Sequence, residues 1–102
     1  MVPTSPYKAP FSNEDTPESQ RIPGAYIVWL RPGYSFEQHK ATVSQAIDVD
    51  KHTRKVDTKL SPGQTIYDTF DVGEEALDVI RADSQVALLE YDAKAWEDDM
   101  PA

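Results

Sequence analysis

The stretch AYIVWL, residues 25–30, is compact, apolar and rich in β-branched and aromatic side chains. Such a run, when turn signals bound it, is typical of a central β-strand. Ile22-Pro23-Gly24 precedes it and Arg31-Pro32-Gly33 follows it. We therefore expect a strand between these two tripeptides, and a folded part that begins at about residue 23.

The segment before this strand, residues 1–22, carries four prolines among small polar and acidic residues. It has few large apolar groups to bury, so we interpret it as a disordered or loosely docked N-terminal arm. The folded domain is expected to span residues 23–96. Residues 97–102 then form an acidic C-terminal tail.

A helix is predicted after the strand, because Ser35 followed by Gln38 is a capping-box pattern. It should run over residues 36–47. Its apolar stripe, at helical spacing, is Phe36, Val43, Ala46 and Ile47, with His39 on the same side. A weaker, partly exposed strand is expected over residues 53–60.

Residues 64–72 alternate with the period of two that is typical of a strand. Ile66, Phe70 and Val72 fall on one face, and Thr65, Tyr67, Thr69 and Asp71 on the other. Gly73 as an N-cap, with two glutamates after it, predicts a second helix that reaches about Ala82. The order continues with VALLEYDAKAW, residues 86–96, which begins as a buried strand and ends in the acidic pair Glu90 and Asp92.

The predicted order is therefore strand, helix, strand, strand, helix, strand. It favours an α+β, ferredoxin-like βαββαβ fold with a four-stranded antiparallel sheet and both helices on one face. This fold hosts many unrelated functions, so it does not identify one.

Composition limits the possible functions. A chain of 102 residues has room for one modest core, and without cysteine it has neither disulfides nor thiolate metal ligands. A net charge of −8 repels nucleic acid and anionic lipid. There is no membrane-span-length apolar run and no signal peptide. We expect a soluble protein, monomeric when free and cytoplasmic or vacuolar, or secreted if a signal peptide was removed.

Catalytic and cofactor chemistry find little support in the sequence. His39 and His52 lack any zinc-site spacing, so we interpret them as a helix-edge residue and a loop residue. No nucleophile elbow and no glycine-rich phosphate loop is present, and we expect neither an enzyme nor a cofactor. Four aromatic residues could form a base-stacking platform, but the acidic charge favours sheet packing for them. These are Tyr26, Trp29, Tyr67 and Phe70.

Three short motifs, in this order and spacing, resemble a known family. They are Tyr26-Ile27-Val28, the run from Phe70 to Leu77 (FDVGEEAL), and Asp83-Ser84-Gln85-Val86 leading into Leu89-Glu90-Tyr91-Asp92. Together they are similar to the propeptide-type inhibitors of subtilisin-like serine proteases, including free-standing fungal proteinase B inhibitors. The resemblance covers about residues 23–96. This chain departs from the family's V-E-x-D motif at Leu89, and it has Tyr91 where a proline or an acid is common.

The resemblance implies a mode of binding. The open sheet face would pack on two surface helices of the protease, with Glu90 and Asp92 at the positions that cap the N-termini of those helices. Unpaired amides and a partial positive charge make such helix ends suitable partners for carboxylates. The plainer interpretation is that Glu90 and Asp92 are solvated acids at a strand end.

The resemblance also implies that the C-terminal tail lies in the substrate cleft like a product. Residue chemistry favours Ala93, Lys94, Ala95 and Trp96 as the contacting segment, with Trp96 in a specificity pocket. The spacing of protease propeptides instead places Asp98 at the cleavage point and Ala95 in an outer pocket. Packing of Trp96 against its own domain is a third reading.

The expected function is inhibition of a subtilisin-like serine protease, with possible assistance to its folding. One alternative is a non-inhibitory interaction or effector module that reuses the same fold. Another is a propeptide excised from a longer protease.

Overall fold

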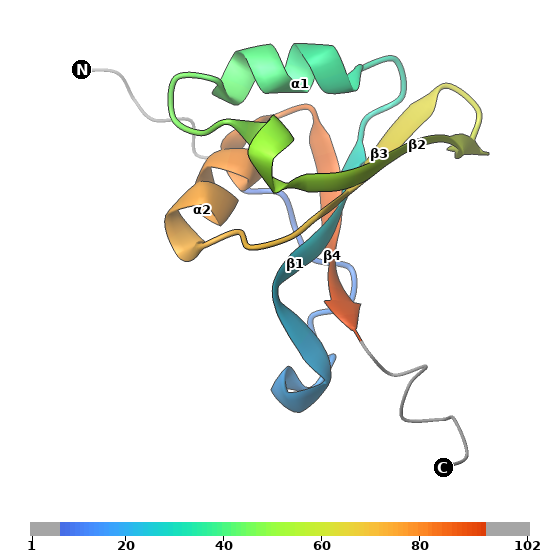
Figure 1. Cartoon of the computed structure of the whole chain (residues 1–102). Coiled ribbons are helices and arrows are strands. Elements are labelled where there is room, and N and C mark those ends of the chain that lie inside the picture. Colours follow the sequence, from blue (N-terminus) through green and yellow to red (C-terminus); the bar gives the residue numbers. More distant parts are fainter. Residues whose placement is uncertain (1–6, 94–102) are drawn as a thin grey trace.

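The computed structural model describes residues 7–93, which form a sheet covered by helices (Figure 1). The elements in chain order are η1 (Glu18–Gln20), β1 (Arg21–Leu30), α1 (Phe36–Val43), η2 (Val49–His52), β2 (Thr53–Ser61), β3 (Gln64–Thr69), α2 (Glu74–Ala82) and β4 (Val86–Ala93). The strands form one antiparallel sheet in the order β2-β3-β1-β4. The predicted α+β class, with a four-stranded antiparallel sheet and two α-helices, is confirmed.

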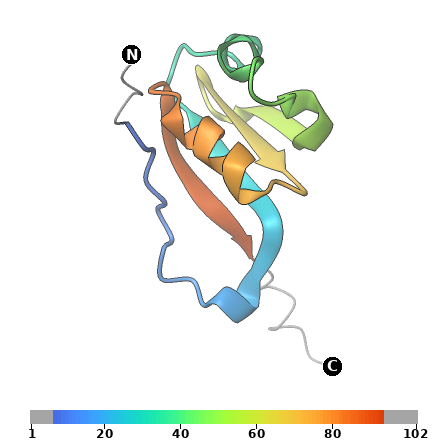
Figure 2. The same ribbon diagram turned by 90° about the vertical axis from the view of Figure 1, so that its left-hand side faces the viewer.

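The core lies between one face of the sheet and the two helices, which are on the same side of it (Figures 1 and 2). Val28 of β1 is aligned with Tyr67 of β3 and with Leu89 of β4, and all three are 0% exposed. The helices contribute Val43 and Ile80 to the same cluster. Burying each large apolar side chain stabilises the fold by about 1.5–3 kcal/mol relative to leaving it exposed. Within residues 7–93, no α-helix covers the other face of the sheet.

Strand β1 is longer than predicted, because the Ile22-Pro23-Gly24 signal lies inside it. The chain continues as a strand through an irregularity, where the register with β4 shifts between Arg21 and Tyr26. Gly24 has φ +76° at this point, and its carbonyl accepts a hydrogen bond from the amide of Val72. Glycine adopts this left-handed conformation readily, so the tripeptide makes a bulge where the sequence predicted a boundary.

Helix α1 begins as predicted and ends early. Its capping box is confirmed, since Ser35 and Gln38 bond each other's backbone amides through their side chains. The end at Val43 rather than Ile47 follows from Ser44, whose hydroxyl and amide both bond the carbonyl of Ala41 and tighten the last turn. Ala46 is consequently exposed, which corrects its place in the apolar stripe.

Strand β3 ends at Thr69, before the predicted limit at residue 72. Tyr67 and Thr69 face the core, and the exposed Phe70 and buried Val72 belong to the connection that follows. Helix α2 has the predicted start after Gly73 and the predicted end at Ala82.

The N-terminal arm differs most from the prediction. Instead of being disordered or loosely docked, residues 7–13 run beside β4, as Figure 2 shows, and a parallel bridge joins Phe11 to Leu89. Ala9 is 0% exposed, and its amide and carbonyl bond Arg81 of α2. The prediction from composition failed because three residues of the arm have specific partners: the Tyr7 hydroxyl donates to Val86, Ala9 bonds Arg81, and Phe11 stacks on Tyr91. Residues 1–6 lie outside the described residues.

Neither α1 nor α2, the α-helices within residues 7–93, has the length and apolar character needed to cross a lipid bilayer.

Candidate functional site

The helix-free side of the sheet, called here the open face, carries two cross-strand rows of side chains. The first row is apolar and joins Leu88 of β4, Trp29 of β1 and Ile66 of β3. The second is mostly charged and consists of Glu90, Ile27, Asp68 and Lys55. Because cross-strand neighbours are about 5 Å apart, each row is a continuous stripe. An apolar stripe beside a charged one suits the recognition of a protein surface.

A shallow hollow of about 210 Å³ lies between the two rows. Its lining residues come from all four strands and are Ile27, Trp29, Lys55, Asp57, Ile66, Asp68 and Glu90. The hollow is smaller than the usual pocket for a small organic ligand, which is about 300 Å³ or more. The open face is therefore better suited to a macromolecular surface than to a metabolite.

Glu90 is held on the open face by two side chains from other segments. The indole nitrogen of Trp29 donates to its Oε1 at 3.2 Å, and the hydroxyl of Ser12 donates to its Oε2 at 3.2 Å. Trp29 is the aligned neighbour of Leu88, two positions before Glu90 on β4. The carboxylate therefore has a defined position in the free protein.

Asp92 forms an ion pair with Arg54 of β2 across the open face. Its Oδ2 is 3.1 Å from Nη2 of Arg54, and the two side chains are 23% and 56% exposed. Asp68 is close to both: burial raises the pKa of the Asp68 carboxyl, the charge of Asp92 raises it further, and Arg54 and Lys55 lower it. A small cluster of opposite charges thus surrounds the end of β4.

The structure brings together the two predicted acidic residues. Glu90 and Asp92 alternate with Tyr91 along β4, so both are on the open face. Of the predicted tail, Ala93 pairs with Arg21 of β1 as the last residue of β4. Lys94, Ala95 and Trp96 lie outside the described residues, as does the alternative register at Asp98.

His39 was predicted to be a helix-edge residue, which is wrong: it is 0% exposed and has two partners in the core. Its Nδ1 is 2.7 Å from Asp83 Oδ2, and its Nε2 is 2.7 Å from the Tyr67 hydroxyl. Tyr34 donates to the same oxygen of Asp83 at 2.7 Å. Since a carboxylate only accepts, Nδ1 carries the proton, and Nε2 accepts from Tyr67. The cluster joins α1, β3 and the end of α2.

A histidine paired with an aspartate is also an element of catalytic triads, so its surroundings matter. Here the imidazole is enclosed, and its second nitrogen is bound to Tyr67. No serine hydroxyl contacts it among the hydrogen bonds of residues 7–93. His39 is therefore part of the packing and not a reactive group. Within the same residues no cluster of three or more potential ligands is placed to hold a metal ion.

The buried histidine predicts a pH-dependent stability. Burial lowers the pKa of His39, and the hydrogen bond and charge of Asp83 offset part of that effect. A histidine whose pKa is lower in the folded state contributes full stability above its unfolded pKa of about 6.5 and loses it as the pH falls below that value. The loss is at most about 1.4 kcal/mol per pH unit.

We expect denaturant titrations to give a lower free energy of unfolding at about pH 5.5 than at about pH 7.5. An NMR titration should place the His39 midpoint below that of a free imidazole. A midpoint above about 6.5 would mean that Asp83 outweighs burial at His39, and the expected loss of stability at low pH would then not occur.

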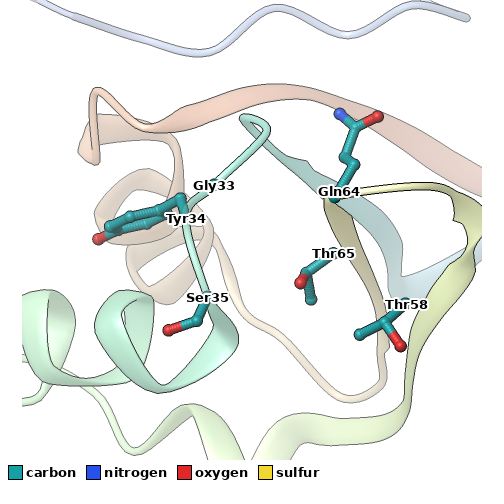
Figure 3. A pocket seen from close by; sticks show the side chains of 7 residues that line it. Gly33, Tyr34, Ser35, Thr58, Gln64 and Thr65 are labelled. Carbon is teal, nitrogen blue, oxygen red and sulfur yellow. The ribbon is translucent and has the colours of Figure 1, made fainter.

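A second hollow, of about 250 Å³, lies at the β2–β3 turn (Figure 3). The side chains of Ser35, Thr58 and Thr65 surround it, and none of its lining residues is charged. The Ser35 hydroxyl is used in the helix cap, and the Gln64 amide donates to the carbonyl of Leu30. This hollow offers little chemistry for a ligand.

The four suggested stacking aromatics do not form a platform. Tyr26 and Tyr67 belong to the core side, Trp29 is on the open face, and Phe70 lies after β3.

Sequence reasoning missed Trp29, Arg54 and Ser12 as partners of the acidic pair. Only the alternation of β1 could have placed Trp29 on the side of the sheet opposite Val28. Nothing in the sequence indicates that Arg54 reaches across two strands or that Ser12 approaches β4.

No protein-family model matches the chain, and comparison with curated proteins gives no match. The functional assignment therefore depends on the site itself.

Proposed function

We propose that this protein inhibits subtilisin-like serine proteases by binding them with its open face and placing its C-terminal tail in the substrate cleft. The observation that carries the proposal is the position of Glu90 and Asp92. They are two residues apart near the end of β4, on the helix-free face. In the adjoining row Trp29 and Leu88 are half-buried and give that face apolar surface to bury, whereas Ile66 is already covered, at 2% exposed.

We also infer that the fold is the ferredoxin-like, split βαβ arrangement. In the order β2-β3-β1-β4, strand β3 separates β1 from β2, and β1 separates β3 from β4. Each helix-connected pair of strands is thus split by one antiparallel strand, as that fold requires. This arrangement is also the one that the resemblance to subtilisin propeptides implies.

The proposed contact is electrostatic and geometric. The first amides of a helix are unpaired and carry a partial positive charge, so a carboxylate that accepts from them stabilises the complex. Two such carboxylates on one face of a strand address two helix ends, and Trp29 has already fixed the position of Glu90. Preorganisation of this kind lowers the entropy lost on binding.

Asp92 requires an exchange of partners. In the free protein Arg54 occupies its Oδ2, and the helix end of a protease would have to displace that guanidinium. The Arg54 side chain is 56% exposed and that of Asp92 is 23% exposed, so solvent screens the pair, and surface pairs are worth about 0.2–1 kcal/mol. Arg54 therefore competes weakly with the protease for Asp92.

This competition predicts that Arg54→Gln tightens binding to the protease by about 1.5- to 5-fold, because the ion pair no longer has to be broken. The dissociation constant measured by inhibition kinetics at low salt would report it. Lys59→Gln is the matched control, since it removes the same charge from an exposed position of β2 away from Asp92. Equal effects of the two variants would indicate a change in overall charge instead.

The proposal as a whole is tested by titrating the protein against subtilisin, with trypsin as the control, and following residual peptide hydrolysis over hours. Stoichiometric and lasting loss of subtilisin activity alone is expected. Recovery over hours would indicate temporary inhibition of the propeptide kind. A folded protein that leaves subtilisin fully active at micromolar concentration would count against the proposal.

The same open face supports a second candidate, an interaction module that does not inhibit a protease. Deletion of residues 94–102 separates the two. An inhibitor should remain folded and lose most of its potency, whereas a module that binds through its sheet face should keep its partner.

A further inference from the structure

The N-terminal arm lies along the outer edge of β4, the strand that carries the proposed contact residues. This edge has no neighbouring strand in the sheet, because β4 is the last strand in the order. An edge strand exposes unpaired amides and carbonyls, which leave it easier to open. If the arm bonds these amides and carbonyls, it stabilises the strand that carries Glu90 and Asp92.

The arm satisfies the outward backbone groups of Leu89 and Tyr91. The amide of Leu89 donates to the carbonyl of Pro10, and the carbonyl of Leu89 accepts from the amide of Ser12, both at 2.9 Å. The side chain of Asn13 then replaces the main chain: its oxygen accepts from the amide of Tyr91 at 2.8 Å, and its nitrogen donates to the Tyr91 carbonyl at 3.1 Å. One side-chain amide thus acts as a neighbouring strand.

The side chain of Tyr91 is held as well. Phe11 stacks on its ring at 4.2 Å with an angle of 4° between the planes, and the guanidinium of Arg21 lies 3.8 Å from the ring centroid. Two groups so close to one ring must occupy opposite faces, so Tyr91 is sandwiched. On the β1 side, by contrast, the register is shifted between Tyr26 and Arg21. The arm therefore supports β4 where its pairing with β1 is irregular.

The arm is itself anchored, and at its far end. Ala9 and Arg81 form the reciprocal pair of bonds described above, and the Arg81 guanidinium lies 4.7 Å from the ring centroid of Phe11. Closer to the site, the Ser12 hydroxyl contacts Glu90 directly. The segment from Ala9 to Asn13 is thus connected to α2 at one end and to the site at the other.

We propose that residues 9–13 are a strap that keeps the end of β4 closed, and that Asn13 is the positioning residue through which it determines how long the protein resists cutting by a protease. This proposal rests on the proposed function for its biological purpose. Its physical basis is independent: a chain must become locally extended and mobile to be cut, and the strap opposes that opening at Tyr91.

The test compares Asn13→Ala with the unaltered full-length chain. Two hydrogen bonds to Tyr91 are lost, so the Tyr91 amide should exchange its hydrogen at least about fivefold faster, while the Glu90 amide, which faces β1, should change little. The rate at which subtilisin cuts the chain should rise by a similar factor. Circular dichroism would verify that the fold is retained.

Two further variants separate positioning from general stability. Asn13→Asp keeps the acceptor for the Tyr91 amide and loses the donor, so it should retain the protection of that amide and be cut at an intermediate rate. Tyr7→Phe removes an arm-to-β4 bond at the opposite end of the strand, where the Tyr7 hydroxyl donates to Val86. It should leave both Tyr91 exchange and the cutting rate unchanged.

If hydrogen exchange of the Tyr91 amide were unchanged in Asn13→Ala, the proposed strap would be wrong. If exchange were faster but the cutting rate unchanged, the proposed effect on protease resistance would be wrong. These outcomes do not depend on inhibition. If the unaltered protein fails to inhibit subtilisin, the proposed function fails, while the exchange and cutting rates still decide the strap.

Discussion

Replacing Asp83 with alanine is expected to lower the free energy of unfolding by about 3 kcal/mol. The carboxylate accepts from His39, Tyr34 and the amide of Gln85, and its side chain is only 4% exposed. Without it, Nδ1–H of the enclosed His39 has no acceptor, and an unsatisfied buried donor is costly. Thermal denaturation should show a decrease in melting temperature on the order of 10–20 °C for a domain of this size.

Two comparisons make this prediction specific. Asp83→Asn has nearly the same shape and still offers one acceptor oxygen, so it should cost clearly less than alanine. Asp78→Ala, on the exposed side of α2, removes a carboxylate without a buried partner and should change stability by less than about 0.5 kcal/mol. If Asp83→Ala and Asp78→Ala were equally stable, the buried cluster would have no energetic importance.

A second large effect is expected at the bulge in β1. Gly24→Ala should lower the free energy of unfolding by about 3 kcal/mol, from two contributions that act together. The backbone has φ +76°, where a side chain costs about 1–2 kcal/mol. The new Cβ would also lie 3.0 Å from the amide nitrogen of Val72 and 3.1 Å from Cα of Asp71, both backbone atoms. Urea denaturation followed by tryptophan fluorescence would measure the loss.

Gly33→Ala separates these contributions. Gly33 has a similar φ of +87°, but an added Cβ would meet nothing within 4 Å. Its alanine variant should therefore show the conformational cost alone, about 1–2 kcal/mol. A Gly24 variant no less stable than the Gly33 variant would indicate that the connection after β3 moves to accommodate the methyl group.

Much of the fold could be predicted because its signals are local. The Ser35 and Gln38 pair fixes the start of α1 through side-chain bonds within four residues, and Gly73 marks the start of α2 as an N-cap without a side-chain bond. Boundaries that depend on distant contacts could not be predicted. Pro23 and Gly24 usually mark a turn, and they are part of a strand here because β4 pairs with Arg21 before them and with Tyr26 after them.

In the candidate site, too, the features with local signals could be predicted and those that depend on distant contacts could not. Alternation along β4 was enough to place Glu90 and Asp92 on one face of a strand. Their partners, Trp29, Ser12 and Arg54, are 38 to 78 residues away in the sequence, and no periodicity relates them. The prediction for His39 was wrong because its partners are also distant in the sequence. Its hydrogen-bond donor, Tyr67, comes from β3, and its acceptor, Asp83, comes from the end of α2.

The bonds between Asn13 and Tyr91 close a loop over a separation of 78 residues. At 5–20 residues per second, a ribosome needs about 4–16 s to synthesise the chain between them. The arm is therefore synthesised before β4, and it can form its bonds to β4 only after that strand has emerged from the ribosome. The prolines at positions 10 and 17 disfavour a helix or a central strand in the arm before β4 is available. Docking of the arm is expected to be the final step of folding, and an incomplete chain would leave it exposed.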